Sequence, residues 1–108
     1  MVVTVSSRHM NVSPALKTYA EQKADKLTKY YDRIQEIEVV FDAAKDTQSV
    51  EMIVNAEHRR EFIAHHEGAD AYACVDECFA KLERQLSDHK KMVRNRKHPE
   101  DSHKPSGI

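Results

Sequence analysis

Hydrophobic residues recur every three or four positions across residues 70–97, a long segment in the C-terminal half of the sequence. This spacing is typical of a helix with one buried face, so we predict a single helix from Asp70 to Lys97. A second helix is predicted from Pro14 to about Tyr31, because a serine followed by a proline, Ser13-Pro14, is a strong helix start. The apolar positions are Leu16, Tyr19, Ala20, Ala24, Leu27 and Tyr31 in the first helix and Ala71, Val75, Cys78, Phe79, Leu82, Leu86 and Val93 in the second.

Apolar and polar residues alternate in four other segments, which is the pattern of strands with one buried face. One segment precedes the first helix, and three follow it, separated by polar turns. The predicted strands are Val2 to Ser6, Ile34 to Asp42, Val50 to Glu57 and Glu61 to His66, with turns at Ala43 to Ser49 and Glu57 to Arg60.

The predicted element order is β-α-β-β-β-α, an α+β fold of two layers. The first two strands should be parallel with a right-handed crossover, and the later strands should pair as antiparallel neighbours, so that a four-stranded mixed sheet has the order 1-2-3-4. Each strand has one apolar face, and both helices must therefore pack on that face of the sheet. The face turned to water would display Glu36, Glu38, Glu51 and Glu61.

The length of 108 residues suits one hydrophobic core, and we predict a single domain at residues 1–97. Residues 98–108 contain two prolines and a glycine with almost no apolar residues, which predicts a disordered C-terminal tail. No segment has the pattern of a signal peptide or the length of a membrane span, so we expect a cytoplasmic protein with no membrane partner.

The charged residues are segregated along the chain, although the net charge is only −1. Residues 1–31 carry an excess of basic residues, residues 32–78 a large excess of acidic ones, and residues 79–108 again an excess of basic ones. A net charge near zero thus conceals a dipolar molecule, with two basic helices opposite an acidic sheet face.

Basic residues follow both predicted helices. Seven lysines and arginines lie between Lys81 and Lys97, interrupted by Glu83 and Asp88, and Lys81, Arg84 and Lys91 lie close to one line along the helix. Lys23, Lys26 and Lys29 form a second ridge on the first helix. Such ridges are candidates for binding phosphates, although solvated helix faces also carry lysine and arginine for solubility.

Two sequence signatures carry a family resemblance: KL followed by YYDRI near residues 26–34, and EGADAYA followed by KLERQLSDHK between residues 67 and 90. With these signatures, residues 1–95 resemble the short-form ribosome hibernation promoting factors and ribosome-associated inhibitors. The resemblance implies a protein that binds the small ribosomal subunit near the decoding channel, blocks messenger and transfer RNA, and keeps ribosomes inactive under stress or in stationary phase. The RNA contacts that it implies are Lys23, Lys26, Lys29, Lys81, Arg84, Gln85, Lys90 and Lys91.

Other functions find less support in the sequence. Cys74 and Cys78 lie four residues apart on a helix, but they are better explained as small buried residues, and we predict no metal site. We also predict no enzyme activity, cofactor or small-molecule substrate, since no catalytic motif is present. We expect a monomer in isolation. The alternative is a protein-interaction module that uses the acidic sheet face or an edge strand.

Overall fold

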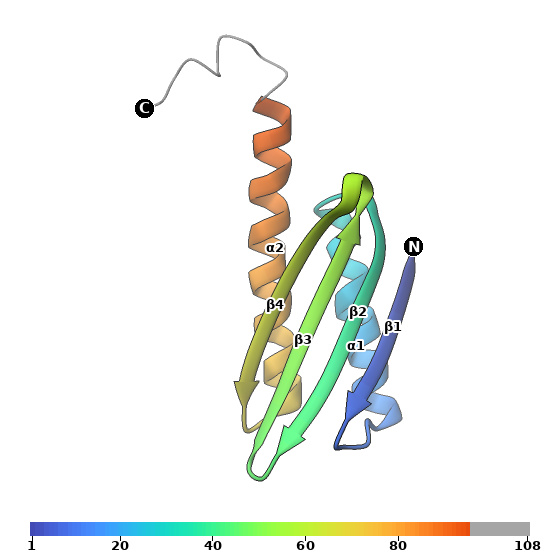
Figure 1. Ribbon diagram of the computed structural model, residues 1–108, viewed down its shortest axis with the longest axis vertical. Coiled ribbons are helices and arrows are strands. Elements are labelled where there is room, and N and C mark those ends of the chain that lie inside the picture. Colours follow the sequence, from blue (N-terminus) through green and yellow to red (C-terminus); the bar gives the residue numbers. More distant parts are fainter. Residues whose placement is uncertain (96–108) are drawn as a thin grey trace.

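A four-stranded sheet packs against two helices in the computed structural model, which describes residues 1–95 (Figure 1). Both helices cover the same face of the sheet, as predicted. The elements are β1 (Val2–Arg8), α1 (Pro14–Lys26), the 3-10 turn η1 (Leu27–Lys29), β2 (Ile34–Ala44), β3 (Thr47–Ala56), the 3-10 turn η2 (Glu57–Arg59), β4 (Arg60–Gly68) and α2 (Ala71–Asn95). The end of the helix predicted to reach Lys97 and the predicted tail at 98–108 lie outside the described residues.

The strand order is β1-β2-β3-β4, and the predicted βαβββα fold is confirmed. β1 pairs with β2 in parallel, with Val3 opposite Ile37, while β2, β3 and β4 pair as antiparallel neighbours. The register places Val39, Met52 and Ala64 in one row on the helix-covered face. The predicted acidic residues alternate with such core positions and lie on the outward face; these are Glu36, Glu38, Glu51 and Glu61.

Both helix starts follow from side chains that accept hydrogen bonds from the first turn. The Ser13 hydroxyl accepts from the Leu16 amide at 3.1 Å, with Pro14 in the first turn, and the Asp70 carboxylate accepts from the Tyr72 amide at 3.0 Å. α1 ends at Lys26, and the chain continues as η1. The helix predicted to Tyr31 is therefore shorter as an α-helix, because its last turn tightens into the 3-10 form.

The strands extend beyond their predicted ends. The β2–β3 turn contains only two residues, Lys45 and Asp46, whereas the sequence predicted a turn from Ala43 to Ser49. Ala44 pairs with Thr47, so backbone pairing continues through polar residues that read as a loop. Strand ends are held by the backbone ladder of the hairpin, which hydrophobic alternation does not report.

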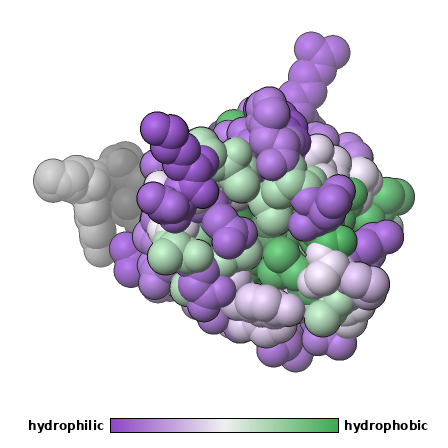
Figure 2. Space-filling model, turned by 90° about the horizontal axis from the view of Figure 1, so that it is seen from below, coloured by the Kyte–Doolittle hydropathy of each residue, from purple (hydrophilic) through white to green (hydrophobic). Residues whose placement is uncertain are grey.

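The core lies between the sheet and the helices. Leu27, Ile37, Phe41, Met52 and Leu82 are among its fully buried side chains. Partly buried hydrophobics, including Met10 and Val12 of the β1–α1 connection, pack at its margin. Figure 2 views the end of the molecule that carries the β2–β3 turn, where apolar patches lie among hydrophilic side chains.

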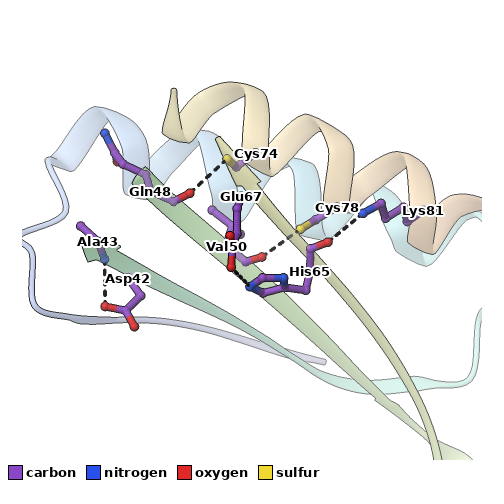
Figure 3. Close-up of polar contacts among 9 residues, drawn as sticks. All are labelled: Asp42, Ala43, Gln48, Val50, His65, Glu67, Cys74, Cys78 and Lys81. Carbon is purple, nitrogen blue, oxygen red and sulfur yellow. Dashed lines mark hydrogen bonds and ion pairs between the residues drawn. The ribbon is translucent and has the colours of Figure 1, made fainter. Parts of the chain in front are cut away.

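The two cysteines belong to this core. The Cys78 thiol donates to the Val50 carbonyl at 3.2 Å, and the Cys74 thiol lies 3.8 Å from the Gln48 carbonyl oxygen (Figure 3). Both thiols are free.

Within residues 1–95, no three His, Cys, Asp or Glu side chains form a group that could hold a metal ion. In the same part of the chain, no helix has the length and apolar character needed to cross a membrane.

Burial raises the pKa of the Cys78 thiol from 9.0 to about 12. The folded state thus favours the neutral thiol, and its contribution to stability is complete below pH 9 and is lost as the pH rises from 9 to 12. We predict that the free energy of unfolding falls in this range, and that Cys78→Ala, although less stable at pH 7.5, loses less between pH 7.5 and pH 10 than the native chain. Denaturant unfolding under reducing conditions measures both. Equal losses would mean that Cys78 does not titrate differently in the two states.

Candidate RNA-binding surface

Lys23 lies between the two helices. Its ammonium nitrogen is 3.5 Å from the Asp76 carboxylate and 5.0 Å from the centroid of the Phe79 ring, and its side chain is only 25% exposed. The Tyr19 hydroxyl donates to the same carboxylate at 2.5 Å, and this bond is the main reason why the pKa of Tyr19 is raised to about 12. Lys23 therefore joins α1 to α2, and its charge is partly offset by Asp76.

Lys29 faces the C-terminal half of α2. Together with Tyr30, Ser87, Lys90 and Lys91 it lines a cleft of about 200 Å³, which we call the η1–α2 cleft. Lys29, Lys90 and Lys91 are exposed, and within residues 1–95 no carboxylate lies within 4.0 Å of their ammonium groups. Lys26 is exposed at the end of α1, one turn before Lys29. Three lysines that form no ion pair within residues 1–95 and lie around a concave surface make a suitable site for phosphate groups.

An acidic residue borders this cleft. A hydrogen bond with Glu83 is the main reason why the pKa of Tyr30 is raised. Tyr30 also packs edge-on against Phe79, with ring centroids 6.3 Å apart. Glu83, which interrupts the basic sequence of α2, thus lies close to Tyr30 at the wall of the η1–α2 cleft.

Lys81 and Gln85 lie on the opposite side of α2, against the outer edge of the sheet. Lys81 Nζ donates to the His65 carbonyl at 2.7 Å (Figure 3), and Gln85 Nε2 donates to the Ile63 carbonyl at 3.0 Å. These bonds satisfy outward carbonyls of β4, which is an edge strand and would otherwise be open to pairing with another chain. The structure therefore does not bring Lys81 and Gln85 together with the lysines of the η1–α2 cleft. Arg84 is exposed and lies between the two groups around the helix.

The predicted RNA contacts did not include several basic residues that the fold brings close to α2. Arg33, His58 and Arg60 line a second cleft together with Tyr31, His89, Val93 and Glu57. Arg33 forms an ion pair with Glu57 at 3.1 Å. The sequence feature that could have indicated this cleft is the run His58-Arg59-Arg60 in a predicted turn. Only the tertiary structure, however, places that turn beside the C-terminal half of α2.

The basic residues of the two clefts therefore lie toward one end of the molecule, where η1, η2 and the C-terminal half of α2 meet (Figure 1). Glu57 and Glu61 are also at this end. The other end, near the β2–β3 turn and the start of α2, carries a group of acidic residues, Asp42, Asp46, Glu67, Asp70, Asp76 and Glu77. The charge separation is thus partly along the long axis of the molecule as well as between its two layers.

A cleft lined by lysines on the helical layer of an α+β domain is one of the features from which nucleic-acid binding is inferred. A family model described as "Sigma 54 modulation protein / S30EA ribosomal protein" matches residues 3–94. The ribosome hibernation promoting factor of Azotobacter vinelandii is 34% identical over 90 residues, which cover 83% of each chain. That of Escherichia coli K12 is 32% identical, over 83% of this chain and 94% of its own length.

Solved structures show the same likeness. A ribosomal subunit interface protein from Coxiella burnetii superposes with a TM-score of 0.78 at 30% identity, covering 84% of this chain and 99% of that one. The N-terminal domain of Protein Y from Thermus thermophilus gives a TM-score of 0.75 at 26% identity, with coverage of 82% and 99%.

The chain therefore belongs to the ribosome hibernation promoting factor family, as its sequence signatures indicated. The family consists of ribosome-associated regulators of translation and not of enzymes.

The junction at Asp76 can be tested through Tyr19. Asp76→Asn removes the charged acceptor that keeps the Tyr19 hydroxyl protonated, so we predict that the pKa of one tyrosine falls from about 12 toward 10. Ultraviolet titration of the native protein measures this change, and Glu77→Gln, on the next residue of α2, is the control. A tyrosine titration that is the same in Asp76→Asn and the native chain would mean that the bond between Tyr19 and Asp76 does not form in solution.

Proposed function

We propose that residues 1–97 form a domain that binds the small ribosomal subunit near the decoding channel through the basic surface of its helices. Binding there blocks messenger and transfer RNA and keeps ribosomes inactive, in hibernation, under stress or in stationary phase. The protein acts in the cytoplasm as a monomer. Membership in the hibernation factor family supports the ribosome as partner.

The η1–α2 cleft is the observation that carries this proposal for the binding surface. Its three lysines converge from two elements, and no carboxylate of residues 1–95 lies within 4.0 Å of them. Ribosomal RNA presents phosphates at high density, and each lysine that neutralises one releases condensed counterions. The predicted contacts at Lys26 and Arg84 extend the same surface. Lys23, Lys81 and Gln85 contribute mainly by holding α2 against α1 and β4.

The alternative is recognition of a protein by the outward sheet face. Ile63 is 46% exposed there and pairs with Ile53, on a face that also carries Glu36, Glu38, Glu51 and Glu61. This arrangement suits a basic protein segment and not RNA, so the two functions require opposite faces of the molecule.

A charge-reversal pair tests the proposed surface. In Lys29→Glu/Lys90→Glu, two lysines of the η1–α2 cleft become repulsive to phosphate, and we predict loss of co-sedimentation with small subunits and loss of inhibition in translation in vitro. In a plot of the logarithm of the residual binding constant against the logarithm of the salt concentration, the slope should be less steep by about 0.7–0.9 for each phosphate contact removed. Both positions are exposed, so the circular dichroism spectrum should not change.

The matched control is Lys17→Glu/Lys45→Glu, which changes the net charge equally at exposed positions toward the other end of the molecule. We expect this variant to bind and inhibit almost as well as the native chain. If both variants lose binding to the same extent, net charge governs association; if only sheet-face variants such as Ile63→Asp lose it, the protein-interaction function is the better account.

A further inference from the structure

The second basic cleft has a different chemical character from the η1–α2 cleft. It has a volume of about 370 Å³ and lies between the chain before β2, the η2 turn and the C-terminal half of α2. We call it the Tyr31 cleft. Its lining residues are Tyr31, Arg33, Glu57, His58, Arg60, His89 and Val93. A volume of this size can hold a small organic group, in contrast to the 200 Å³ of the η1–α2 cleft.

Aromatic rings form one wall of the Tyr31 cleft. The rings of Tyr31 and His89 have centroids 5.2 Å apart, and each also packs edge-on against Phe62, at 6.5 and 5.3 Å. Tyr31 and His89 are only 8% and 6% exposed, so packing fixes their rings before any ligand arrives and leaves only a small part of each ring to face the cleft. A wall fixed in this way loses little conformational entropy when it contacts a flat ligand.

Guanidinium groups form the rim. Arg33 contacts Glu57 at 3.1 Å, and both side chains are about half exposed, so the fork of N–H donors on Arg33 is not fully used by this pair. Arg60 is exposed, and among residues 1–95 no carboxylate lies within 4.0 Å of its guanidinium group. Exposed arginines beside an aromatic wall suit a phosphate that is attached to a planar group.

The η2 turn holds this rim at a cost in backbone conformation. His58 and Arg59 have φ values of 64° and 60°, in the left-handed region where asparagine or glycine would be favoured in a hairpin. The Glu57 amide also donates to the Arg33 carbonyl at 3.0 Å, which ties the turn to the chain before β2. Of the two residues with positive φ, His58 lines the Tyr31 cleft, and Arg60 directly follows the turn.

We propose that the Tyr31 cleft binds one unstacked nucleotide of a single-stranded RNA segment, with the base against the Tyr31–His89 wall and its phosphate on Arg33 and Arg60. Single-stranded RNA offers splayed bases to aromatic residues, whereas a duplex keeps its bases stacked and paired. The inference rests on the proposed function, because the two clefts flank the same half of α2. In this arrangement the η1–α2 cleft binds phosphates of any RNA, and the Tyr31 cleft selects unpaired RNA.

Fluorescence anisotropy with labelled oligonucleotides tests the division of roles. The probes are a ten-nucleotide single-stranded RNA and a duplex of the same sequence. The native chain should prefer the single strand, and Arg33→Gln/Arg60→Gln should bind it about tenfold more weakly while its affinity for the duplex changes much less. Lys17→Gln/Lys45→Gln, which removes the same charge from other exposed sites, should retain the preference. An unchanged preference in Arg33→Gln/Arg60→Gln would overturn the inference.

Nuclear magnetic resonance of the ring protons of Tyr31 and His89 locates the base. These signals should shift with the single-stranded RNA and not with the duplex. Equal shifts with free adenosine monophosphate at the same concentration would assign the cleft to free nucleotides and overturn the RNA proposal.

A different result would contradict the proposed function itself, namely that Lys29→Glu/Lys90→Glu still binds ribosomes. If that variant loses ribosome binding and Arg33→Gln/Arg60→Gln retains its preference for single strands, the function stands and the inference about the Tyr31 cleft does not.

Discussion

The packing of both helices on one face of the sheet is the constraint from which the rest of the structure follows. Each strand has a single apolar face, and residues such as Ile37, Phe41 and Met52 can be removed from water only by covering that face. α1 and α2 must therefore lie side by side, and the other face of the sheet remains in water. This arrangement brings lysines from η1 and α2, far apart in the sequence, to one cleft.

The fold could be predicted because local patterns and long-range packing agree. Alternation located the strands, the serine and proline at residues 13 and 14 located the start of α1, and a strand-helix-strand unit leaves few topologies open. The ends of the strands were less predictable. Thr47 to Ser49 are polar and read as a turn, yet the backbone ladder with β2 continues through them.

The candidate site was predictable only in part. Sequence spacing gives the direction in which a side chain points from its own helix, but it does not give the residues of other elements that the side chain contacts. Lys23 and Lys81 both appear as exposed cations in the sequence, but one contacts Asp76 and the other contacts the His65 carbonyl of β4. Arg33 and Arg60 come from segments without helical periodicity, and tertiary structure alone brings them to α2. Lys29 and Lys90 were among the predicted contacts and are exposed, while the cleft between them depends on the way in which η1 continues α1.

The central claim is that the surface formed by η1 and the C-terminal half of α2 contacts ribosomal RNA. The most direct measurement is the rate of lysine acetylation, followed by mass spectrometry, in the free protein and in its complex with the small subunit. We predict strong protection of Lys29, Lys90 and Lys91 in the complex and unchanged reactivity of Lys17 and Lys45, since the latter lie away from that surface. Protection of Lys45 without protection of Lys29, Lys90 and Lys91 would contradict the account.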